Sequence, residues 1–206
     1  SWRLWRVWGE NEVPSRAPPL NARGVLALCH YMWTWGYPGA ALVTLVAFAT
    51  FLRTMEFITM RAGQLCFNAT NTRLHIQLPS TKGASRRGGM EGVTVEDPLI
   101  IAAVCKWSNS AKPGDLLMEL TCGQYRVLFS AACEACGLTS SFKPYSLRRG
   151  GASHHFRRFG NMSLTMDIGR WAEIRTAKTY INTALLELTS MRCLETDLIA
   201  SAADSF

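Results

Sequence analysis

The most informative stretch of the chain covers residues 143–152 and reads Lys143-Pro144-Tyr145-Ser146-Leu147-Arg148-Arg149-Gly150-Gly151-Ala152. Pro144 suits the start of a helix, because the amide proton it lacks has no partner in a first helical turn. Gly150 and Gly151 add no side chain, so another segment can approach this helix at close backbone distance. The stretch therefore predicts the start of a basic helix that packs closely against a neighbour.

The rest of the chain predicts a mostly helical domain with one small sheet. Residues 21–35 have amphipathic helical spacing with Asn21 as a candidate cap, and residues 39–60 form a long apolar helical run. The pattern then changes to three short segments that are rich in β-formers or alternate in polarity: Gln64–Phe67, Arg73–Pro79 and Gly92–Val95. Asp97-Pro98 opens a further helix, and helical patterns fill most of the remainder. The expected fold class is α+β: mostly α, with a small three-stranded antiparallel sheet.

The chain has 206 residues, enough for one large domain. We expect residues 1–20 to be a linker from a preceding region, residues 21–184 to be the main domain and residues 185–206 to be a tail helix. Tryptophans and arginines alternate in the first eight residues, which leaves open an arm that contacts nucleic acid. No stretch reaches the roughly 18 apolar residues of a spanning helix, and no secretory signal opens the chain, so we expect no membrane association.

The charge of the chain is unevenly distributed. It has 22 basic and 15 acidic residues and a net charge of +7, and eight of the basic residues lie between Lys143 and Lys178. The segment from Ile181 to the C-terminus is net acidic. A basic block of this kind indicates a polyanionic partner, although charge alone is equally compatible with a solvated basic face.

The seven cysteines are odd in number and scattered, which is typical of reduced thiols in an intracellular protein. Cys133 and Cys136 form the only close pair. A zinc site needs four ligands, and neither a second cysteine pair nor a closely spaced histidine pair accompanies them. We interpret both as small buried side chains and expect neither a metal nor a cofactor.

An ordered set of cations followed by a tyrosine carries the chemistry. Arg53 ends the apolar run, Lys82 lies at the turn of the second predicted hairpin, and Arg148 lies in the basic helix. Trp171 follows Gly169-Arg170, and Tyr180 comes nine residues later. Taken singly, each has an ordinary interpretation: Arg53 with Glu56 as a surface pair at i,i+3 spacing, Lys82 as a solvated turn residue, and Tyr180 as an aromatic residue on an amphipathic helix.

Taken together, this order resembles the catalytic domain of the tyrosine recombinases, the phage-integrase-like enzymes. It resembles in particular their eukaryotic mobile-element branch, whose second-arginine motif reads Ser-Leu-Arg-Arg-Gly-Gly-Ala. The family order is Arg, Lys on a β-hairpin, His-x-x-Arg, His or Trp, and Tyr. The resemblance covers about residues 21–185 and implies a catalytic set of Arg53, Lys82, Tyr145, Arg148, Trp171 and Tyr180. One position departs from the family, since Tyr145 stands where the motif has His, and a phenol with a pKa of about 10 is a poor base near neutrality.

The resemblance implies DNA strand cleavage and rejoining through a 3′-phosphotyrosine. Tyr180 would attack the scissile phosphorus, and Lys82 would protonate the 5′-oxygen leaving group. Arg53 and Arg148 would hold the non-bridging oxygens with paired donors, and Trp171 would add its indole N–H. Because guanidinium groups supply the positive charge, this chemistry needs no metal.

The resemblance also implies partners: double-stranded DNA, and further copies of the chain in a tetramer on that DNA. The expected contacts to the DNA backbone are Arg86, Arg87, Arg149, Arg157 and Arg158. His154 and His155 lie beyond the motif, and we expect surface or packing roles for them. The tail helix is expected to pack either on its own core or on a neighbouring protomer. In a eukaryote the protein would be nuclear.

Two alternatives remain from the sequence. The first is a decayed mobile-element domain that binds DNA without cutting it, which Tyr145 favours. The second is a type IB topoisomerase-like enzyme, which uses a similar catalytic set. The short chain and the Ser146–Gly151 run argue against the topoisomerase.

Overall fold

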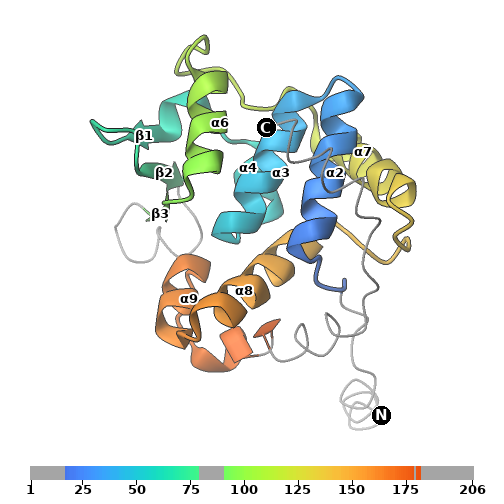
Figure 1. Cartoon of the computed structure of the whole chain (residues 1–206), viewed down its shortest axis with the longest axis vertical. Coiled ribbons are helices and arrows are strands. Elements are labelled where there is room, and N and C mark those ends of the chain that lie inside the picture. The colour runs from blue at the N-terminus through green and yellow to red at the C-terminus, as the bar shows by residue number, and fades with distance from the viewer. Residues whose placement is uncertain (1–16, 79–90, 179, 182–206) are drawn as a thin grey trace, which may run out of the picture.

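The computed structural model describes residues 17–78, 91–178, 180 and 181. Its centre is helix α3 (Pro38–Thr50), which contacts α2 (Ala22–Thr34), α4 (Thr54–Ile58), α6 (Pro98–Ser108) and α8 (Tyr145–Phe159). Almost every side of α3 is apolar and buried, which fits a helix enclosed by other elements. Figure 1 shows the sheet on one side of this central group, α7 (Cys122–Ala135) on the other, and α8 with α9 (Met162–Gly169) below.

The helix predicted over residues 39–60 is not continuous, because the structure breaks it after Thr50 and resumes it as α4 at Thr54. Phe51 adopts the left-handed conformation with φ of 52°, and Arg53 then caps the short helix α4. Phe51 and Leu52 are both buried, so tertiary packing prevails here over a continuous helical pattern. The break places Arg53 at the N-cap of α4, where it pairs with Glu56.

The three predicted strands are confirmed. Strands β1 (Leu65–Phe67), β2 (Leu74–Leu78) and β3 (Glu91–Val95) form an antiparallel sheet in the order β1-β2-β3, preceded by the 3-10 turn η1 (Ala62–Gln64). Leu74 pairs with Val95 and Leu78 pairs with Glu91. Segment 79–90 therefore joins two paired strand ends, as a hairpin connection should.

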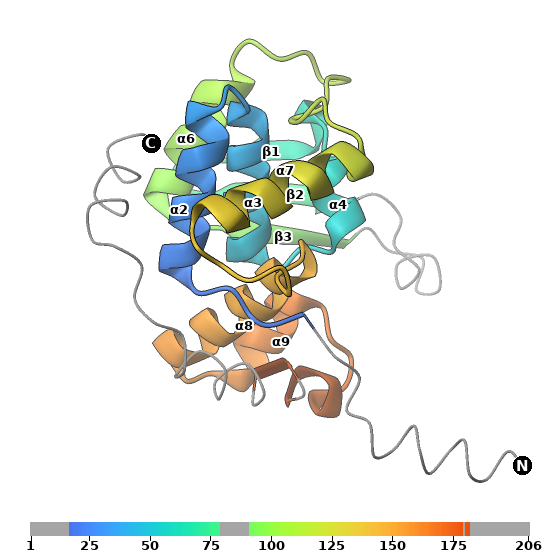
Figure 2. The same cartoon turned by 90° about the vertical axis from the view of Figure 1, so that its right-hand side faces the viewer.

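Side-chain caps set the starts of the other helices. The Asn21, Asp97 and Asn161 side chains accept backbone N–H bonds at α2, α6 and α9. Helix α7 begins at Cys122, where Thr121 and Gln124 form a reciprocal capping box. Figure 2 shows α7 lying across the face of α2 and α3 opposite the sheet.

Cys133 and Cys136 are buried at the C-terminal end of α7, as expected for packing residues. Within the described residues, no three or more His, Cys, Asp or Glu side chains gather as a metal site would require. Among the same residues, the helices are also too short or too polar to cross a membrane.

The glycines of α8 permit the close approach that the sequence predicts. A Cβ atom on Gly150 would lie 1.8 Å from the carbonyl oxygen of Leu20, and one on Gly151 would lie 2.0 Å from that of Phe48. Both obstacles are backbone atoms, which cannot move aside without shifting a whole segment. These glycines therefore let α8 pack closely against Leu20 and against Phe48 near the end of α3.

Candidate active site

Arg148 is a deeply buried residue of the candidate site. It is 3% exposed, its Nη1 donates to the carbonyl of Phe51, and its Nη2 donates to the carbonyl of Gly169 at 2.6 Å. These acceptors end α3 and α9, so the guanidinium is fixed between two helix termini. Burial, together with the neighbouring Arg170 and Arg53, lowers the pKa of Arg148 to about 10. Arg148 therefore still carries its charge at neutral pH.

Arg53 lies near Arg148 but is more open to solvent. Its backbone N–H donates to Glu56 Oε2 at 2.8 Å, and its Nη1 donates to Glu56 Oε1 at 2.7 Å. The Arg53 side chain is 47% exposed, whereas that of Glu56 is 9% exposed. Because the Phe51 carbonyl binds Arg148, the turn after α3 brings both motif arginines to one place. This pairing of a buried and an open guanidinium suits an anion that approaches from solvent.

Trp171 and Tyr180 complete a stack beside Arg148. The Cζ atom of Arg148 lies 4.9 Å from the centre of the Trp171 ring. The Tyr180 ring lies against the same indole, with centroids 4.9 Å apart and planes inclined by 25°. Trp171 therefore contacts both a buried cation and the candidate nucleophile.

Tyr145 contacts the candidate nucleophile directly. It is the first residue of α8, and its hydroxyl forms a hydrogen bond with the hydroxyl of Tyr180. Partial burial and this bond raise the pKa of Tyr145, and the charges of Arg148 and Arg149 offset only part of the rise. Tyr145 thus keeps its proton at neutral pH and can donate it in a hydrogen bond to the Tyr180 oxygen.

The structure brings five of the six predicted catalytic residues together. They are Arg53, Tyr145, Arg148, Trp171 and Tyr180. Lys82 lies outside the described residues, as do Arg86, Arg87 and the segments 1–16 and 182–206.

The expected surface position of Arg149 is wrong. Arg149 is 1% exposed, and its Nη1 donates to the carbonyl of Ala17. Residues 17–20 cross this side of α8 and enclose the guanidinium, which a helical pattern alone does not reveal. Arg157 and Arg158 are exposed near the C-terminal end of α8, where the sequence predicts surface contacts.

The two histidines of α8 have the surface and packing positions that the sequence predicts: His154 is exposed and His155 is half-buried. His155 Nδ1 lies 2.8 Å from Thr165 Oγ1 and so links α8 to α9. The His154 ring lies 5.7 Å from that of Phe48 at the end of α3.

Arg170 is the residue that sequence reasoning missed. Its Nη2 lies 2.5 Å from Glu56 Oε2, and both side chains are less than 10% exposed. The run Gly169-Arg170-Trp171 stands out in the sequence, but the motif gives a role only to the tryptophan. Spacing could not reveal the pair, since its members lie 114 residues apart.

Comparison with known proteins supports a fold assignment. Neither a family model nor a curated protein matches the sequence. Among solved structures, the XerH site-specific recombinase in a post-cleavage complex with palindromic difH substrate matches with a TM-score of 0.62 at 11% identity, over 84% of this chain and 51% of that one. XerA recombinase matches with a TM-score of 0.62 at 14% identity, over 86% of this chain and 67% of that one.

The catalytic domain of bacteriophage HP1 integrase matches with a TM-score of 0.60 at 18% identity, over 85% of this chain and 93% of that domain. The chain thus spans about half the length of XerH but nearly the whole integrase catalytic domain. The described part of this chain has the fold of a tyrosine-recombinase catalytic domain.

Proposed function

We propose that this chain is the catalytic domain of a site-specific DNA recombinase that cleaves a DNA strand with Tyr180. One observation carries the proposal: the Tyr180 ring stacks on Trp171, and the buried guanidinium of Arg148 lies over the same indole. The similarity in fold to XerH, which was solved on its difH substrate, supports DNA as the partner. The proposal includes an assembly of several copies on DNA and an origin in a mobile element.

The proposed step exchanges one phosphoester bond for another. The Tyr180 oxygen bonds to phosphorus and loses its proton to water, while the bond from phosphorus to the 5′-oxygen breaks. Lys82 protonates the departing 5′-oxygen. The products are a 3′-phosphotyrosyl link and a free 5′-hydroxyl, so reversal of the same step rejoins DNA without an outside energy source.

The two arginines have different parts in this step. Both Nη atoms of Arg148 already bind a carbonyl, but each keeps a second N–H for a phosphate oxygen. Arg53 approaches from the solvent side with its exposed guanidinium. Charge that develops on the non-bridging oxygens therefore meets two fixed cations, which is where preorganised electrostatics lower a barrier most.

Tyr145 acts as a hydrogen-bond donor, because its raised pKa keeps the phenol protonated near neutrality. A protonated Tyr145 hydroxyl stabilises the negative charge on Tyr180 as the phenol ionises. Since Tyr180 lies against Tyr145 and Trp171 of its own chain, the proposal also places cleavage in cis.

A second candidate function is DNA binding without cleavage. Tyr145 favours it, because the raised pKa leaves no group at the motif histidine position that can accept a proton near neutrality. The two candidates differ in one observable, the covalent adduct.

Covalent trapping separates them. The protein is incubated in EDTA with nicked duplexes whose cut fragment diffuses away, and adducts that survive SDS are mapped by mass spectrometry. We expect an adduct on Tyr180 in the wild type and none in Tyr180→Phe. Tyr37→Phe, at an exposed tyrosine between α2 and α3, is the matched control and should keep the adduct. Salt-sensitive binding without any adduct would favour the second candidate.

Delivery in cis has its own test. An equimolar mixture of Tyr180→Phe and Arg148→Met chains contains every catalytic group, but no single chain holds them all. Cleavage in cis predicts no adduct from this mixture. An adduct on the Arg148→Met chain would show that its Tyr180 acts in a neighbour's site.

A further inference from the structure

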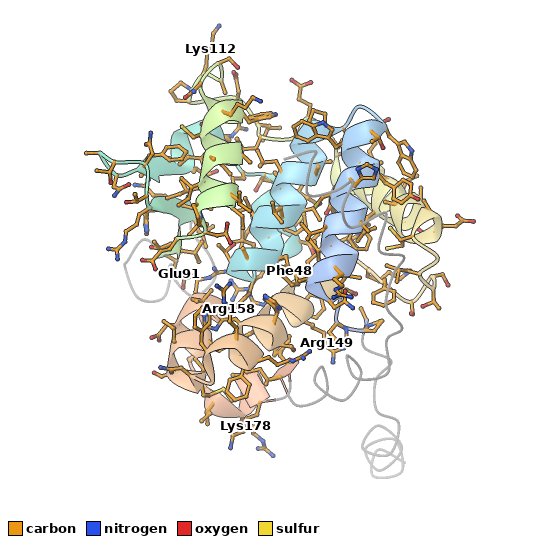
Figure 3. All side chains as sticks on the ribbon, in the orientation of Figure 1. Phe48, Glu91, Lys112, Arg149, Arg158 and Lys178 are labelled. Atoms are coloured by element: carbon orange, nitrogen blue, oxygen red, sulfur yellow. The ribbon has the colours of Figure 1, made fainter. Side chains whose placement is uncertain are left out.

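Arg170 joins three segments through one buried guanidinium. Its side chain is 8% exposed, with Nη2 at 2.5 Å from Glu56 Oε2 and Nε at 3.7 Å from Glu91 Oε2. Glu56 lies in the first turn of α4, which Arg53 caps, and Glu91 begins β3. Figure 3 labels Glu91 at the end of the sheet that faces α9. The end of α9 is thereby tied to the elements that flank Arg53 and segment 79–90.

The backbone at Arg170 has a conformation that glycine adopts more readily. Arg170 ends α9 in the left-handed region, with φ of 55° and ψ of 42°. A side chain with a Cβ atom is disfavoured there, and glycine is the usual residue at such a helix end. An arginine in this place therefore indicates a use for its side chain.

The turn around Arg170 also contacts the rest of the site. The carbonyl of Gly169 accepts a hydrogen bond from Arg148, and Trp171 lies against Arg148 and Tyr180. Gly169 and Trp171 thus contact Arg148 and Tyr180 directly, and Arg170 reaches Arg53 through Glu56.

Glu56 is the point where Arg170 acts on Arg53. Its carboxylate accepts three bonds: from the backbone N–H of Arg53, from Arg53 Nη1 and from Arg170 Nη2. If Arg170 were absent, Arg53 alone would compensate the charge of Glu56. Arg53 would then be held more strongly by the carboxylate, and the site would lose one positive charge. Arg170 Nη1 is buried without a hydrogen-bond partner among the described residues, so part of its charge is left unmatched there.

We propose that Arg170 is a positioning residue that neutralises Glu56, so that Arg53 can bind the scissile phosphate. Through Glu91 it also anchors the strand that follows the Lys82 segment. This inference rests on the proposed function, and two experiments test it, one of them independent of cleavage.

The first experiment is a double-mutant cycle on unfolding. Urea midpoints are measured for Arg170→Gln, Glu56→Gln and the double variant. Because the two side chains form one pair, the double variant should lose clearly less than the sum of the single losses. The matched control is the exposed pair Arg73–Glu96, with N–O distance of 3.0 Å and side chains 67% and 63% exposed. Its variants should shift the midpoint little. Additive losses for Arg170 and Glu56 would overturn the inference.

The second experiment separates cleavage from DNA binding. With saturating protein, Arg170→Gln should slow adduct formation by about 10- to 100-fold, the usual result of misplacing a catalytic group. The DNA affinity should fall by no more than the loss of one phosphate contact, because Arg170 itself is buried and only the contact of Arg53 depends on it. Arg170→Lys should recover part of the rate, since it restores the charge but not the reach to both carboxylates. Arg170→Gly relieves the left-handed backbone but should remain slow.

The outcomes distinguish this inference from the proposed function. If the wild type forms an adduct and Arg170→Gly forms it equally fast, the side chain of Arg170 has no positioning role and only the inference fails. If the wild type forms no adduct on DNA that it binds, the proposed function fails. The double-mutant cycle would then reduce Arg170 to a structural ion pair, and its positioning role would fall with the function.

Discussion

Two buried regions of this molecule differ in the chemistry of their side chains: one is apolar and the other contains buried arginines. Where α2, α3 and α7 meet, the buried side chains are almost all apolar, and the Thr44 hydroxyl pairs with that of Tyr125 at 2.7 Å. Where α8 and α9 meet α3 and α4, Arg148 and Arg170 are buried, and Arg149 is buried on the side of α8 that residues 17–20 cross. Figure 1 shows the first region above and the second below.

The apolar region and the arginine region are suited to different roles. Burying apolar area stabilises by about 25 cal/mol per Å², whereas burying a guanidinium costs solvation that pairing only partly returns. The arginine region is thus an inefficient way to stabilise a fold but a suitable way to hold fixed positive charge. We expect the apolar region to set the unfolding free energy and the arginine region to set cleavage.

The largest effect on stability is expected at Gly150, where α8 packs against the backbone of Leu20. Gly150→Val would force a side chain into the backbone of Leu20, because a Cβ atom at Gly150 would lie 1.8 Å from the Leu20 oxygen. The expected loss exceeds about 4 kcal/mol, which places the variant among the most damaging substitutions. Circular dichroism in urea measures it.

The control for this substitution is Gly123→Ala, in helix α7 with nothing within 4 Å of the added Cβ. It should raise stability by about 0.5–1 kcal/mol, because alanine suits a helix better than glycine. A Gly150→Val chain with the wild-type urea midpoint would contradict the close approach of α8.

The next effect tests the apolar region alone. Leu28→Ala removes a fully buried side chain from α2, where exposure is 0%. The loss should be about 2–5 kcal/mol, from the lost burial and the cavity left behind. The rate of adduct formation per folded molecule should stay at the wild-type value. A rate that falls along with stability would show that the two regions are not separable.

Features that depend on neighbouring residues are predicted better from the sequence than features that depend on distant partners. The α2 cap, the three strands and the start of α6 follow from local signals: Asn21, alternating polarity and Asp97-Pro98. Each depends on residues a few positions apart, so a single pass along the chain suffices. Motif order predicts six candidate catalytic residues, and the structure places the five that it describes together.

What failed depends on distant partners. Arg148 and Arg149 are adjacent and chemically identical in the sequence, and only the fold shows that Arg149 is enclosed by residues 17–20. The break at Phe51 is tied to Arg148 across 97 positions. Arg170 has no predicted role because both of its glutamates come from other elements. Pairing across such separations leaves no trace in periodicity.

Arg148→Met tests the arginine region. Two hydrogen bonds to buried carbonyls are lost, but so is a desolvated cation whose pKa is lowered to about 10 by burial and by Arg170 and Arg53. These effects oppose each other, so the unfolding free energy should change by less than about 2 kcal/mol. Adduct formation should fall by at least about 100-fold. A loss of stability as large as that of Leu28→Ala would contradict the proposed division.

A matched pair of tyrosine substitutions compares the regions at the scale of one hydroxyl. Tyr125→Phe removes the bond to Thr44 in the apolar region and should cost about 1 kcal/mol without changing cleavage. Tyr145→Phe removes the bond to Tyr180 from a side chain that is 36% exposed. It should leave stability nearly unchanged but slow adduct formation. The reverse pattern would place the functional hydroxyl at Tyr125.

The smallest expected effect is the pH dependence of stability that comes from the two histidines of α8, in the arginine region. Burial first, and then nearby positive charge, lowers the pKa of His154 and His155 below the ordinary 6.5. As pH falls below about 6.5, the unfolded chain therefore takes up protons before the folded chain does, and stability declines. His155→Gln should flatten this decline, since a neutral amide can still meet Thr165. Urea midpoints between neutral pH and the folded pKa measure the slope. If the urea midpoint of His155→Gln fell with pH as steeply as that of the wild type, the loss of stability would come from His154 or from carboxylates. The hydrogen bond between His155 and Thr165 would then not depend on pH in this range.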